Sequence, residues 1–571
     1  MKLLNLHVDY IKFKPLKKAL KKIEDLEDKS EKEVRDALVV LIAVEKGDED
    51  VNAIVKKFVE SVEDVAGKVN AKNMVLYPYA HLSSNLASPD VAMEVLKEAE
   101  KALNKKKYKV VRAPFGYYKE FEMKVKGHPL SELSREIKLG GKVGGNEEII
   151  DLSEKERNKL LHEISKAKLD TSKLRDNDHR ILGRKMDLWS FNNVAPGMVF
   201  WHSKGLHIKN KLIEFWREMH KKEGYKEIST PQIMDRKLWE VSGHWSKYSE
   251  NNFKTEYENR DFLVKPMNCP GGMLVYNTSP KSYKDFPLKV GELGWVHRIE
   301  LSGVLAGLFR VIQFVQDDAH IFCTLEQAEE EIAKVIDLTK KILDTFKLKI
   351  DHVELSTRPE KRIGTDKEWD FAERTLEKVL KKKKMKYKIN KGDGAFYGAK
   401  IDYHLKDSLG RTWQCSTIQF DMSLPRRFKL TYTAENGEEK MPVMLHRTIY
   451  GSLERFLGVY TEHVDGKFPL WISPNQIKVM TLNDSVKDYA QEVFEKFKEE
   501  GFEIELDDRA ESIGKKARDA QIQRFNYLVT VGEKEATDKK IAVKKRDEKE
   551  INVTDLDEFI SKLKEEIVER K

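Results

Sequence analysis

Two changes in residue pattern divide the 571-residue chain into segments that we expect to fold separately. A glycine-rich stretch at 140–145 ends the first segment, and after Pro474 the pattern changes to short apolar runs that alternate with amphipathic stretches. The large region between them is rich in aromatic residues. Because a single hydrophobic core rarely serves more than roughly 250–300 residues, the length also favours several domains. We therefore expect a multidomain protein with α/β and α+β folds.

Residues 1–140 are predicted to form a small α/β domain. The apolar patterns of residues 3–10 and 37–44 are typical of β-strands. Pro89 is expected to begin an amphipathic helix that extends to Leu103. Residues 141–195 follow as a linker, with the glycine-rich stretch as a hinge and a polar connecting helix from 152 to about 184.

The last segment, 471–571, is predicted to be an α/β domain in which helices cover a sheet. Strands are expected at four apolar runs, which are 477–480, 502–506, 527–531 and 541–543. Between the first two runs, apolar residues from Val486 to Phe497 recur with helical spacing, and Gly501 is expected to end that helix.

The composition excludes several classes of protein. Charged residues make up 35% and apolar residues 40% of the chain, which excludes a disordered chain, and no apolar run approaches the roughly 20 residues of a membrane span. Three cysteines cannot build a disulfide framework, and the first residues lack the apolar centre of a signal peptide. We therefore expect a cytoplasmic protein without membrane association.

Positive charge does not by itself identify a partner. The net charge of +8 is too small to establish a nucleic-acid partner. The run at 381–384 consists of four lysines and follows an amphipathic stretch, so we expect it to be a solvated helix end and not an RNA-binding patch.

The densest group of charged residues lies between 296 and 320. On a β-hairpin, Arg298 and Glu300 would share one face of a strand, and a glycine-rich turn would return Arg310 beside them. Such a group could hold two phosphates and the amino group of an adenine. By themselves these residues favour an ordinary cross-strand salt bridge. A further arginine, Arg455, follows Gly451 near the expected start of a helix, where small residues permit close approach.

Taken together, these segments resemble the signature motifs of class II aminoacyl-tRNA synthetases. Motif 2 corresponds to 298–310, motif 3 ends at Arg455, and motif 1 ends at 230–231 after a long helix that begins near Lys204. Four further segments are similar to archaeal-type threonyl-tRNA synthetases, namely KPMNCPG at 265–271, QDDAH at 316–320, GAFYG at 394–398 and LHR at 445–447. The resemblance covers essentially the whole chain and implies a catalytic core with an antiparallel sheet at 196–470.

The resemblance implies the residues that act in this core. Catalytic roles are implied for Arg298, Lys400, Arg455 and His244. ATP or substrate binding is implied for Glu300, Arg310, Gln316, Asp318, Tyr397, Gln414, Gln419 and Ser452. Mg²⁺ would accompany ATP. For His244, a surface loop position is an equal alternative, and Gly272, where many relatives carry histidine, is given no role.

A zinc site is also implied by the resemblance, with one Zn²⁺ per subunit. Its ligands would be Cys269, His320 and His446, although spacing alone would favour three structural residues. The other two cysteines, Cys323 and Cys415, are expected to be small buried residues.

Zinc-based recognition has a consequence for fidelity. Three protein ligands leave one or two positions open, and the resemblance implies that the amino group and the hydroxyl of threonine fill them. Valine, which lacks the hydroxyl, can then be rejected strongly. Serine lacks only a methyl group, which is worth about 1–3 kcal/mol of discrimination. Hydrolytic editing of mischarged seryl-tRNA is therefore expected.

Both ends of the chain resemble family domains. Residues 1–140 are similar to the archaeal editing domain, whose fold resembles D-aminoacyl-tRNA deacylases, on the strength of YAHLS at 79–83 and PFGYYK at 114–119. The implied editing residues are His81, Tyr118, Lys119 and Glu132. Alternatively, the lysine is a snorkelling strand residue or the domain only docks RNA. Residues 471–571 are similar to an anticodon-binding domain, in which the implied contacts are Arg518, Glu535 and Lys544, although surface charge explains these nearly as well.

The expected function is ATP-dependent attachment of L-threonine to tRNA(Thr) by a homodimer that associates through motif 1. One alternative is another class II synthetase, specific for serine or proline. A second alternative is a non-catalytic regulator that binds tRNA. The presence of Arg298, Glu300, Arg310 and Arg455 counts against the regulator, because decay should have removed some of them.

Overall fold

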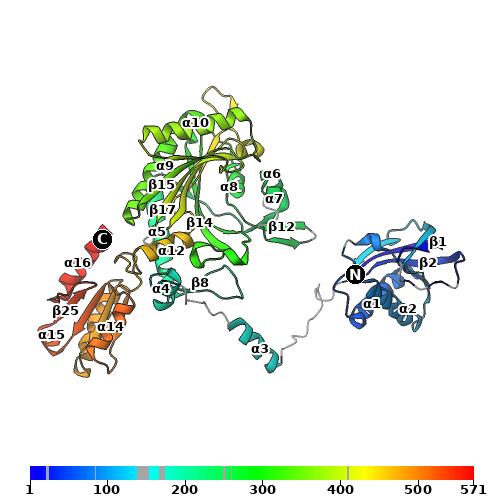
Figure 1. Ribbon diagram of the computed structural model, residues 1–571, viewed down its shortest axis with the longest axis horizontal. Coiled ribbons are helices and arrows are strands. Elements are labelled where there is room, and N and C mark those ends of the chain that lie inside the picture. The colour runs from blue at the N-terminus through cyan, green and yellow to red at the C-terminus, as the bar shows by residue number, and fades with distance from the viewer. Residues whose placement is uncertain are drawn as a thin grey trace. The chain divides into compact units, whose positions relative to one another are not determined.

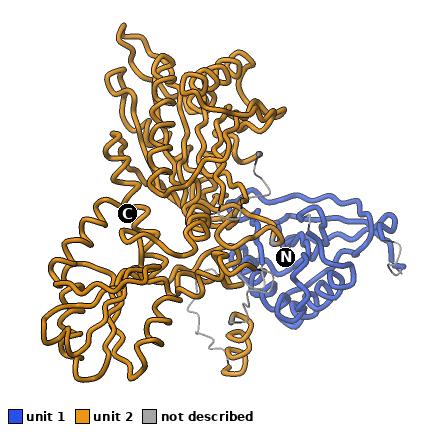
Figure 2. The backbone as a smooth tube through the Cα atoms, turned by 60° about the vertical axis from the view of Figure 1, so that its left-hand side comes forward, with its two compact units in different colours: residues 1–151 blue, residues 152–571 orange. Residues whose placement is uncertain are grey.

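The computed structural model describes residues 1–20, 23, 25–26, 28–83, 85–137, 153–165, 174–247, 252–258, 260–407 and 410–570. The chain forms two compact units, Met1–Asp151 and Leu152–Lys571, which are coloured separately in Figure 2. The glycine-rich stretch that was expected to be a hinge lies outside the described residues.

The first unit is a six-stranded sheet with two long helices on one face (Figure 1). Five strands follow the order β4-β3-β2-β1-β5, and β6 also pairs with β1. The strands are β1 Lys2–Lys18, β2 Lys32–Ala43, β3 Asn73–Pro78, β4 Lys109–Arg112, β5 Tyr117–Val125 and β6 Glu132–Glu136. The helices are α1 Val51–Val69 and α2 Pro89–Asn104, and a one-turn helix, η1, spans Ala80–Leu82.

Sequence periodicity explains how this unit packs. Alternate residues of β2, such as Leu38 and Val40, pack with Phe58 of α1 and Leu96 of α2, whereas Val39 belongs to the apolar cluster on the other face. A serine at position 88 caps α2 and a proline follows it, as the sequence predicts for a helix start. The predicted strands at 3–10 and 37–44 and the helix from Pro89 are confirmed.

The second unit is built around an eight-stranded, mainly antiparallel sheet with the order β16-β15-β17-β18-β21-β14-β13-β9. Its strands are β9 Lys226–Glu227, β13 Leu288–His297, β14 Gln313–Cys323, β15 Ile350–Ser356, β16 Lys388–Asn390, β17 Gly398–Lys406, β18 Thr412–Asp421 and β21 Val443–Thr448. Only the β13–β9 and β15–β16 pairs are parallel among these neighbours. An antiparallel core sheet is therefore confirmed.

Helices cover one face of this sheet and leave the other face partly polar. The principal helices on this face are α5 Ser203–Lys222, α9 Leu325–Thr345, α10 Asp366–Lys382 and α12 Leu453–His463. Helix α8 Cys269–Tyr276 lies on the opposite face, where Tyr276 packs against Phe322 of β14. On β17, Ile401 and Tyr403 pack in one core with α9 and α10. Because side chains alternate along a strand, Lys400, Asp402 and His404 lie on the opposite face.

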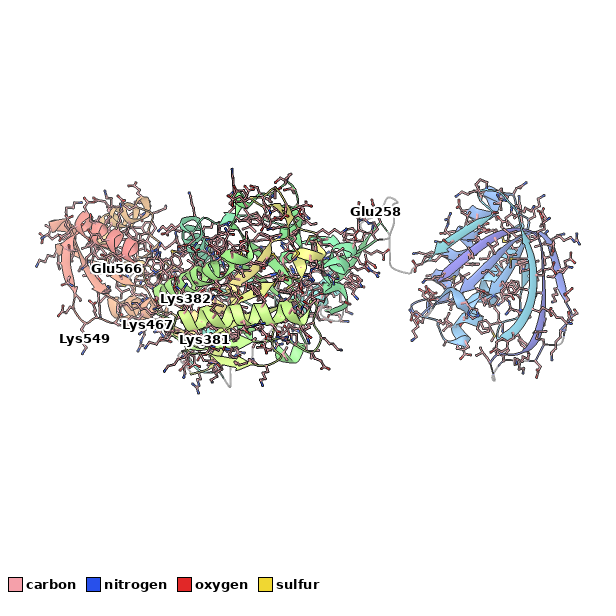
Figure 3. All side chains as sticks on the ribbon, turned by 90° about the horizontal axis from the view of Figure 1, so that it is seen from above. Glu258, Lys381, Lys382, Lys467, Lys549 and Glu566 are labelled. Atoms are coloured by element: carbon pink, nitrogen blue, oxygen red, sulfur yellow. The ribbon has the colours of Figure 1, made fainter. Side chains whose placement is uncertain are left out.

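The lysine run ends α10 as predicted. Lys381 and Lys382 are exposed in the last turn, and Figure 3 shows both projecting from this helix. Lys381 pairs with Glu377 one turn earlier. Basic side chains at a helix C-terminus are favoured by the helix dipole, so the run has a structural explanation.

Smaller elements complete the second unit. A three-stranded sheet is made of β10 Ile233–Asp235, β11 Lys254–Tyr257 and β12 Arg260–Val264, beside helices α6 Arg236–Ser242 and α7 His244–Lys247. Short elements elsewhere are α3 Glu154–Ser165, α4 His179–Lys185, β7 Trp189–Ser190, β8 Phe200–Trp201, α11 Leu424–Arg427, β19 Tyr432–Thr433 and β20 Glu439–Lys440. The predicted connecting helix is thus represented by two helices, α3 and α4, and residues between them lie outside the described ranges.

The C-terminal segment is a five-stranded sheet of order β23-β22-β24-β25-β26. Its strands are β22 Ile477–Thr481, β23 Ile504–Asp507, β24 Tyr527–Val531, β25 Lys540–Lys545 and β26 Asn552–Asp555. Its helices are α13 Lys487–Glu499, α14 Ile513–Ile522, α15 Glu533–Asp538 and α16 Leu556–Glu569. The four predicted strands are confirmed, with the second beginning at Ile504, and β26 is an edge strand that the polar sequence did not indicate.

Candidate functional site

A cavity of about 370 Å³ opens on the polar face of the eight-stranded sheet. Residues from the β13–β14 connection, from strands β14, β17, β18 and β21 and from the start of α12 meet there. Twelve residues singled out from the sequence line it: Arg298, Glu300, Arg310, Gln316, Asp318, Tyr397, Lys400, Gln414, Gln419, His446, Ser452 and Arg455. Segments far apart in the sequence thus converge on one space.

The expectation that Arg298 and Glu300 lie on a strand is wrong. Strand β13 ends at His297, and both residues belong to the connection that follows. One backbone hydrogen bond between the two chain segments continues beyond β13, from the N–H of Arg298 to the carbonyl of Ile312. The side chains of Arg298 and Glu300 therefore reach the cavity from a loop. Glycines in this segment give the loop backbone the freedom to turn.

Two arginines of the β13–β14 connection have different surroundings. Arg298 donates from Nε to the Pro266 carbonyl at 3.1 Å, and its guanidinium lies 5.3 Å from the centre of the Phe314 ring. Arg310 pairs with Glu300 at 2.9 Å, and half of the Arg310 side chain is exposed. A pair this exposed contributes little stability and can open for a ligand.

Arg455 is fixed more firmly at the start of α12. Its Nε donates to the Phe309 carbonyl at 2.9 Å, and Ser452 caps the helix by accepting a hydrogen bond from the Arg455 N–H. Burial lowers the pKa of Arg455, and the neighbouring Arg310 and Arg298 add to this effect. Arginine stays charged despite such shifts, so three guanidinium groups face one cavity and favour a polyanionic ligand such as a polyphosphate.

Lys400 belongs to a hydrogen-bonded network on β17 and β18. Its Nζ lies 2.7 Å from Asp402 and 3.0 Å from Asp393. Burial alone would lower the pKa of Lys400, but the charge of Asp402 and hydrogen bonds to both carboxylates outweigh burial and raise it. Asp402 also accepts hydrogen bonds from Gln414 and Thr417. Lys400 is therefore held as a fixed positive charge at the cavity wall.

His446, which lines the cavity, belongs to a group of three possible metal ligands. The ligand atoms of Cys269, His320 and His446 all lie within 4.8 Å of one another, and all three residues are buried. Cys269 lies in the first turn of α8, and His320 and His446 are directly paired on β14 and β21. The three expected ligands are thus brought together.

The chemistry of this group fits a zinc ion. Nε2 of His446 lies 2.8 Å from Asp421, which fixes the ring proton there and leaves Nδ1 with a lone pair. Nε2 of His320 is buried without a hydrogen-bond partner among the described residues. One thiolate and two imidazoles are ligands that Zn²⁺ accepts, and a fourth position stays available for a substrate.

Two further residues define the surroundings of this group. Burial raises the pKa of Asp318 to about 6, although Asn268 and nearby positive groups oppose this effect. A Cβ added at Gly272 would lie 3.5 Å from Nδ1 of His320, which is ordinary van der Waals contact. With its pKa raised to about 6, the Asp318 carboxyl group beside the three ligands can gain or lose a proton close to neutral pH.

His244 is buried, so the alternative of a surface loop position is wrong. Its Nδ1 lies 2.9 Å from the Ser242 hydroxyl, and its ring contacts Phe396 and Tyr397. His244 does not line the cavity, but Tyr397 does. Burial, with further contributions from His446 and other positive groups, lowers the pKa of His244 to about 3, so the ring is neutral at pH 7.

The cysteine predictions are confirmed in their burial. Cys323 and Cys415 are buried, and burial raises the pKa of each thiol to about 12. Neither thiol is therefore a ready nucleophile or metal ligand. Cys415 also contributes to the wall of the cavity.

Two site residues were missed in the sequence. Asp421 orients His446 and follows Gln419 by two positions on β18, and Asp402 holds Lys400 and follows it by two positions on β17. A spacing of two places residues on the same face of a strand, so this spacing was the available signal.

The first unit has its own cavity, of about 490 Å³. His81, Tyr118 and Lys119 line it together with Tyr77 and further aromatic residues. Glu132 does not: it is exposed on β6, where it pairs with Leu6 of β1. The structure thus assembles three of the four residues singled out for editing.

Lys119 is the main polar group of this second cavity. Its Nζ donates to the carbonyls of Pro114 and Tyr117 at 3.0 and 3.2 Å and lies 4.9 Å from the centre of the Tyr77 ring. Burial lowers the pKa of Lys119 to about 8. The ammonium group points at backbone carbonyls at the cavity, which differs from a lysine that snorkels to open solvent.

The three residues assigned to anticodon contacts lie on separate elements. Arg518 is exposed on α14, and Lys544 lies on β25. Glu535 accepts a hydrogen bond from the Gly532 N–H and so caps α15, which gives it a structural role.

None of the described helices is long and apolar enough to span a bilayer.

Three family descriptions match separate parts of the chain. Residues 1–137 match the archaea-specific editing domain of threonyl-tRNA synthetase, residues 253–464 match the class II tRNA synthetase core domain for glycine, histidine, proline, serine and threonine, and residues 476–566 match an anticodon-binding domain.

Curated relatives are similar over most of the chain. A threonine–tRNA ligase of Clostridium tetani is 49% identical over 426 residues, which cover 73% of this chain and 66% of the relative. A threonine–tRNA ligase of Desulfatibacillum aliphaticivorans is 52% identical over 409 residues, which cover 72% and 63%. The chain thus spans just under two thirds of the length of these relatives.

Two solved structures of threonyl-tRNA synthetases are also similar to the chain. The RNA-binding domain of threonyl-tRNA synthetase from Cryptosporidium parvum is 40% identical with a TM-score of 0.66, and the match covers 68% of this chain and 98% of that structure. A putative threonyl-tRNA synthetase from Aeropyrum pernix is 27% identical with a TM-score of 0.60, and the match covers 69% and 97%.

Proposed function

Because the chain belongs to the threonyl-tRNA synthetase family of class II aminoacyl-tRNA synthetases, we propose that it attaches L-threonine to tRNA(Thr) and removes misattached serine. The editing domain would be 1–140, the linker 141–195, the catalytic domain 196–470 and the anticodon-binding domain 471–571. We further propose that it acts in the cytoplasm as a homodimer. The single observation that carries the proposal is the cavity that is lined by three arginines and by His446, one of the three possible metal ligands.

The first step would join threonine to ATP. The threonine carboxylate would attack the α-phosphorus, the bond to the β-phosphate oxygen would break, and pyrophosphate would leave with Mg²⁺. Arg298 would stabilise the charge on the α-phosphate, while Arg310 and Arg455 would hold the γ-phosphate. Once Arg310 turns to phosphate, Glu300 is free to accept a hydrogen bond from the adenine amino group, because their present pair is weak.

Selection of threonine would occur beside the three ligands. When held by Cys269, His320 and His446, Zn²⁺ would supply open coordination positions for the amino group and the hydroxyl of the substrate. Asp318 would accept a hydrogen bond from that hydroxyl. Valine offers no hydroxyl to these groups and would be rejected, whereas serine would pass.

The remaining cavity residues would position the adenylate. Gln316, Tyr397, Gln414 and Gln419 present polar groups along its walls, and the Tyr397 hydroxyl already donates to Gln419 at 2.7 Å. Lys400 would keep its fixed charge near the phosphate. A nitrogen with a pKa of about 3 is a poor base at neutral pH, so we assign His244 to support of Tyr397 in the transfer step and not to proton removal.

Editing would take place in the cavity of the first unit. The ester of seryl-tRNA would enter beside His81, Tyr118 and Lys119, and the Lys119 ammonium would donate a hydrogen bond to the ester carbonyl as water attacks. A 2′-hydroxyl of the RNA would help to position that water. The aromatic walls suit the exclusion of bulk solvent, and Glu132 takes no part in this cavity.

The test is amino-acid-dependent ATP–pyrophosphate exchange followed by aminoacylation of transcribed tRNA(Thr), with and without a zinc chelator. We expect exchange with threonine, weak exchange with serine and none with valine or proline, and we expect chelation to stop the reaction. Exchange with serine or proline but not threonine would identify a different synthetase. Binding of tRNA without any exchange would identify a non-catalytic regulator.

A further inference from the structure

Three possible metal ligands project from the polar face of β15 and β17, outside the cavities described above. His352 and Glu354 lie on β15 and His404 on β17, and the two histidines are cross-strand partners in strands that are adjacent in Figure 1. One ligand atom from each lies within 4.8 Å of the others. Each side chain is about one fifth exposed, so an ion from solvent can reach the group.

The spacing of these atoms matches a shared ion better than hydrogen bonds. Nε2 of His352 lies 3.4 Å from one oxygen of Glu354, and Nε2 of His404 lies 3.5 Å from the other. These distances exceed the usual limit of about 3.2 Å for a hydrogen bond. Two ligands placed at about 2.1 Å from a tetrahedral Zn²⁺ are about 3.4 Å apart. Each histidine nitrogen therefore stands at nearly this separation from one oxygen of Glu354, and an ion shared by both would engage both carboxylate oxygens.

The two imidazole rings have the packing expected of neutral rings, and they would turn out of this stack to direct both lone pairs at one ion. The rings of His352 and His404 are stacked with centroids 4.3 Å apart and planes inclined by 9°. Two protonated rings at this distance would repel each other. Neutral imidazole is the form that binds metal ions.

Neighbouring polar groups orient the ligands. Nδ1 of His352 lies 2.7 Å from Asp351, so its proton is held there and the Nε2 lone pair faces Glu354. Asn390 donates to Glu354 at 2.9 Å and fixes the carboxylate. A carboxylate behind a histidine is the usual arrangement in metal sites, because it sets the tautomer and the ring angle.

The charge balance also calls for a cation. Glu354 lies directly opposite Asp402 in the strand register, and like charges in that position repel. Asp402 is compensated by Lys400 at 2.7 Å. Across the described ranges, no lysine or arginine comes within 4.0 Å of Glu354, whose carboxylate lies beside the two histidines. A bound divalent ion would supply the missing positive charge.

We infer that His352, Glu354 and His404 bind one divalent transition-metal ion, with Zn²⁺ as the best match and water as the fourth ligand. Two imidazoles and one carboxylate suit zinc, whereas Mg²⁺ prefers a shell of oxygen atoms. The ion would tie β15 to β17 one step beyond Lys400 and Asp402. This inference does not depend on the proposed ligase function.

Zinc titration of the metal-free full chain tests the inference. We expect about two equivalents in the unaltered protein and about one in His352→Gln, His404→Gln or Cys269→Ser, because each variant removes one ligand of one site. His162→Gln, which changes an exposed histidine on α3, serves as the matched control and should keep both. Glutamine keeps the polarity of these partly exposed positions, so the fold should persist.

Cobalt spectra identify which site is filled. The Cys269 group should give a thiolate-to-cobalt charge-transfer band, which His404→Gln keeps and Cys269→Ser loses. The second site should give only ligand-field absorption, with the opposite response. A single equivalent that disappears in Cys269→Ser, or two equivalents in both histidine variants, would overturn the inference. If Cys269→Ser has no effect while His404→Gln loses one equivalent, the inference stands and the zinc assignment of the catalytic cavity fails.

Discussion

Replacement of Lys119 by methionine is expected to slow hydrolysis of seryl-tRNA strongly while threonine attachment continues. Methionine retains most of the apolar stem but removes the ammonium group that meets two carbonyls and the Tyr77 ring. An ammonium group has three protons, and two of them are already directed at Pro114 and Tyr117. One proton is therefore available for the ester carbonyl of the substrate.

The loss of one such donor sets the magnitude. Removal of a single preorganised donor from a catalytic site typically lowers kcat by about 10²–10³-fold, or about 2.7–4 kcal/mol. We expect the same reduction in the rate of deacylation by Lys119→Met. Aminoacylation should be unchanged, because the cavity of the second unit shares no residue with the first.

The pH dependence follows from the direction of the shift. Lysine is charged below its pKa, and burial lowers the pKa of Lys119 from 10.5 to about 8. Enzyme-catalysed deacylation, corrected for spontaneous ester hydrolysis, should therefore fall as the pH rises through about 8, and the residual rate of Lys119→Met should lack this fall.

The assay is single-turnover deacylation of preformed seryl-tRNA(Thr) by the full chain between pH 6.5 and 9.5, values chosen to lie roughly 1.5 units either side of the Lys119 pKa. Lys14→Met, which alters an exposed lysine on β1, is the control and should behave like the unaltered protein. Equal deacylation rates in the two variants would refute the role of Lys119. A wild-type profile with no fall near pH 8 would refute the argument from burial.

Three further results are expected. Asp421→Asn should weaken zinc binding by the Cys269, His320 and His446 group about 10–100-fold in a chelator competition, because Asp421 orients His446. An unchanged affinity of this group for zinc would contradict the orienting role. Lys209→Met should lower the free energy of unfolding by about 3–5 kcal/mol in urea, since it removes the positive charge that lies 2.8 Å from the buried Glu454 carboxylate. An unaltered unfolding midpoint would show that the ion pair is dispensable. Removal of metal by a chelator should abolish threonine-dependent exchange and added zinc should restore it; exchange that persists in metal-free protein would count against metal-assisted recognition.

Local order was well predicted from the sequence because its causes are local. The helix from Pro89 has a serine cap, a proline in its first turn and an apolar stripe, all of which are visible as residue spacing. The strand at 527–531 appears as a short apolar run and is found at those residues. Motif order also indicated which segments would meet, through the resemblance to the family.

The sequence predicted less well where the location of a side chain depends on segments that are distant in the chain. Arg298 follows β13 and does not lie on it, because the strand ends where the connection to β14 begins. His244 is buried against Phe396 and Tyr397, although its local sequence is compatible with a surface loop. Glu132 is exposed on β6 and does not line the cavity of the first unit. Burial depends on segments that are distant in the chain, so local sequence cannot reveal it.

The sequence by itself determined the helices and strands that have a clear local pattern, together with the chemical types of the site residues, because side-chain spacing and composition are written in it. Only the tertiary structure decided which of these residues touch. Strand register pairs His320 with His446 and brings Cys269 to them, and the same register joins His352 to His404 around Glu354. Register is fixed by the packing of whole strands against their helices, and a contact between distant residues exists only after that packing forms.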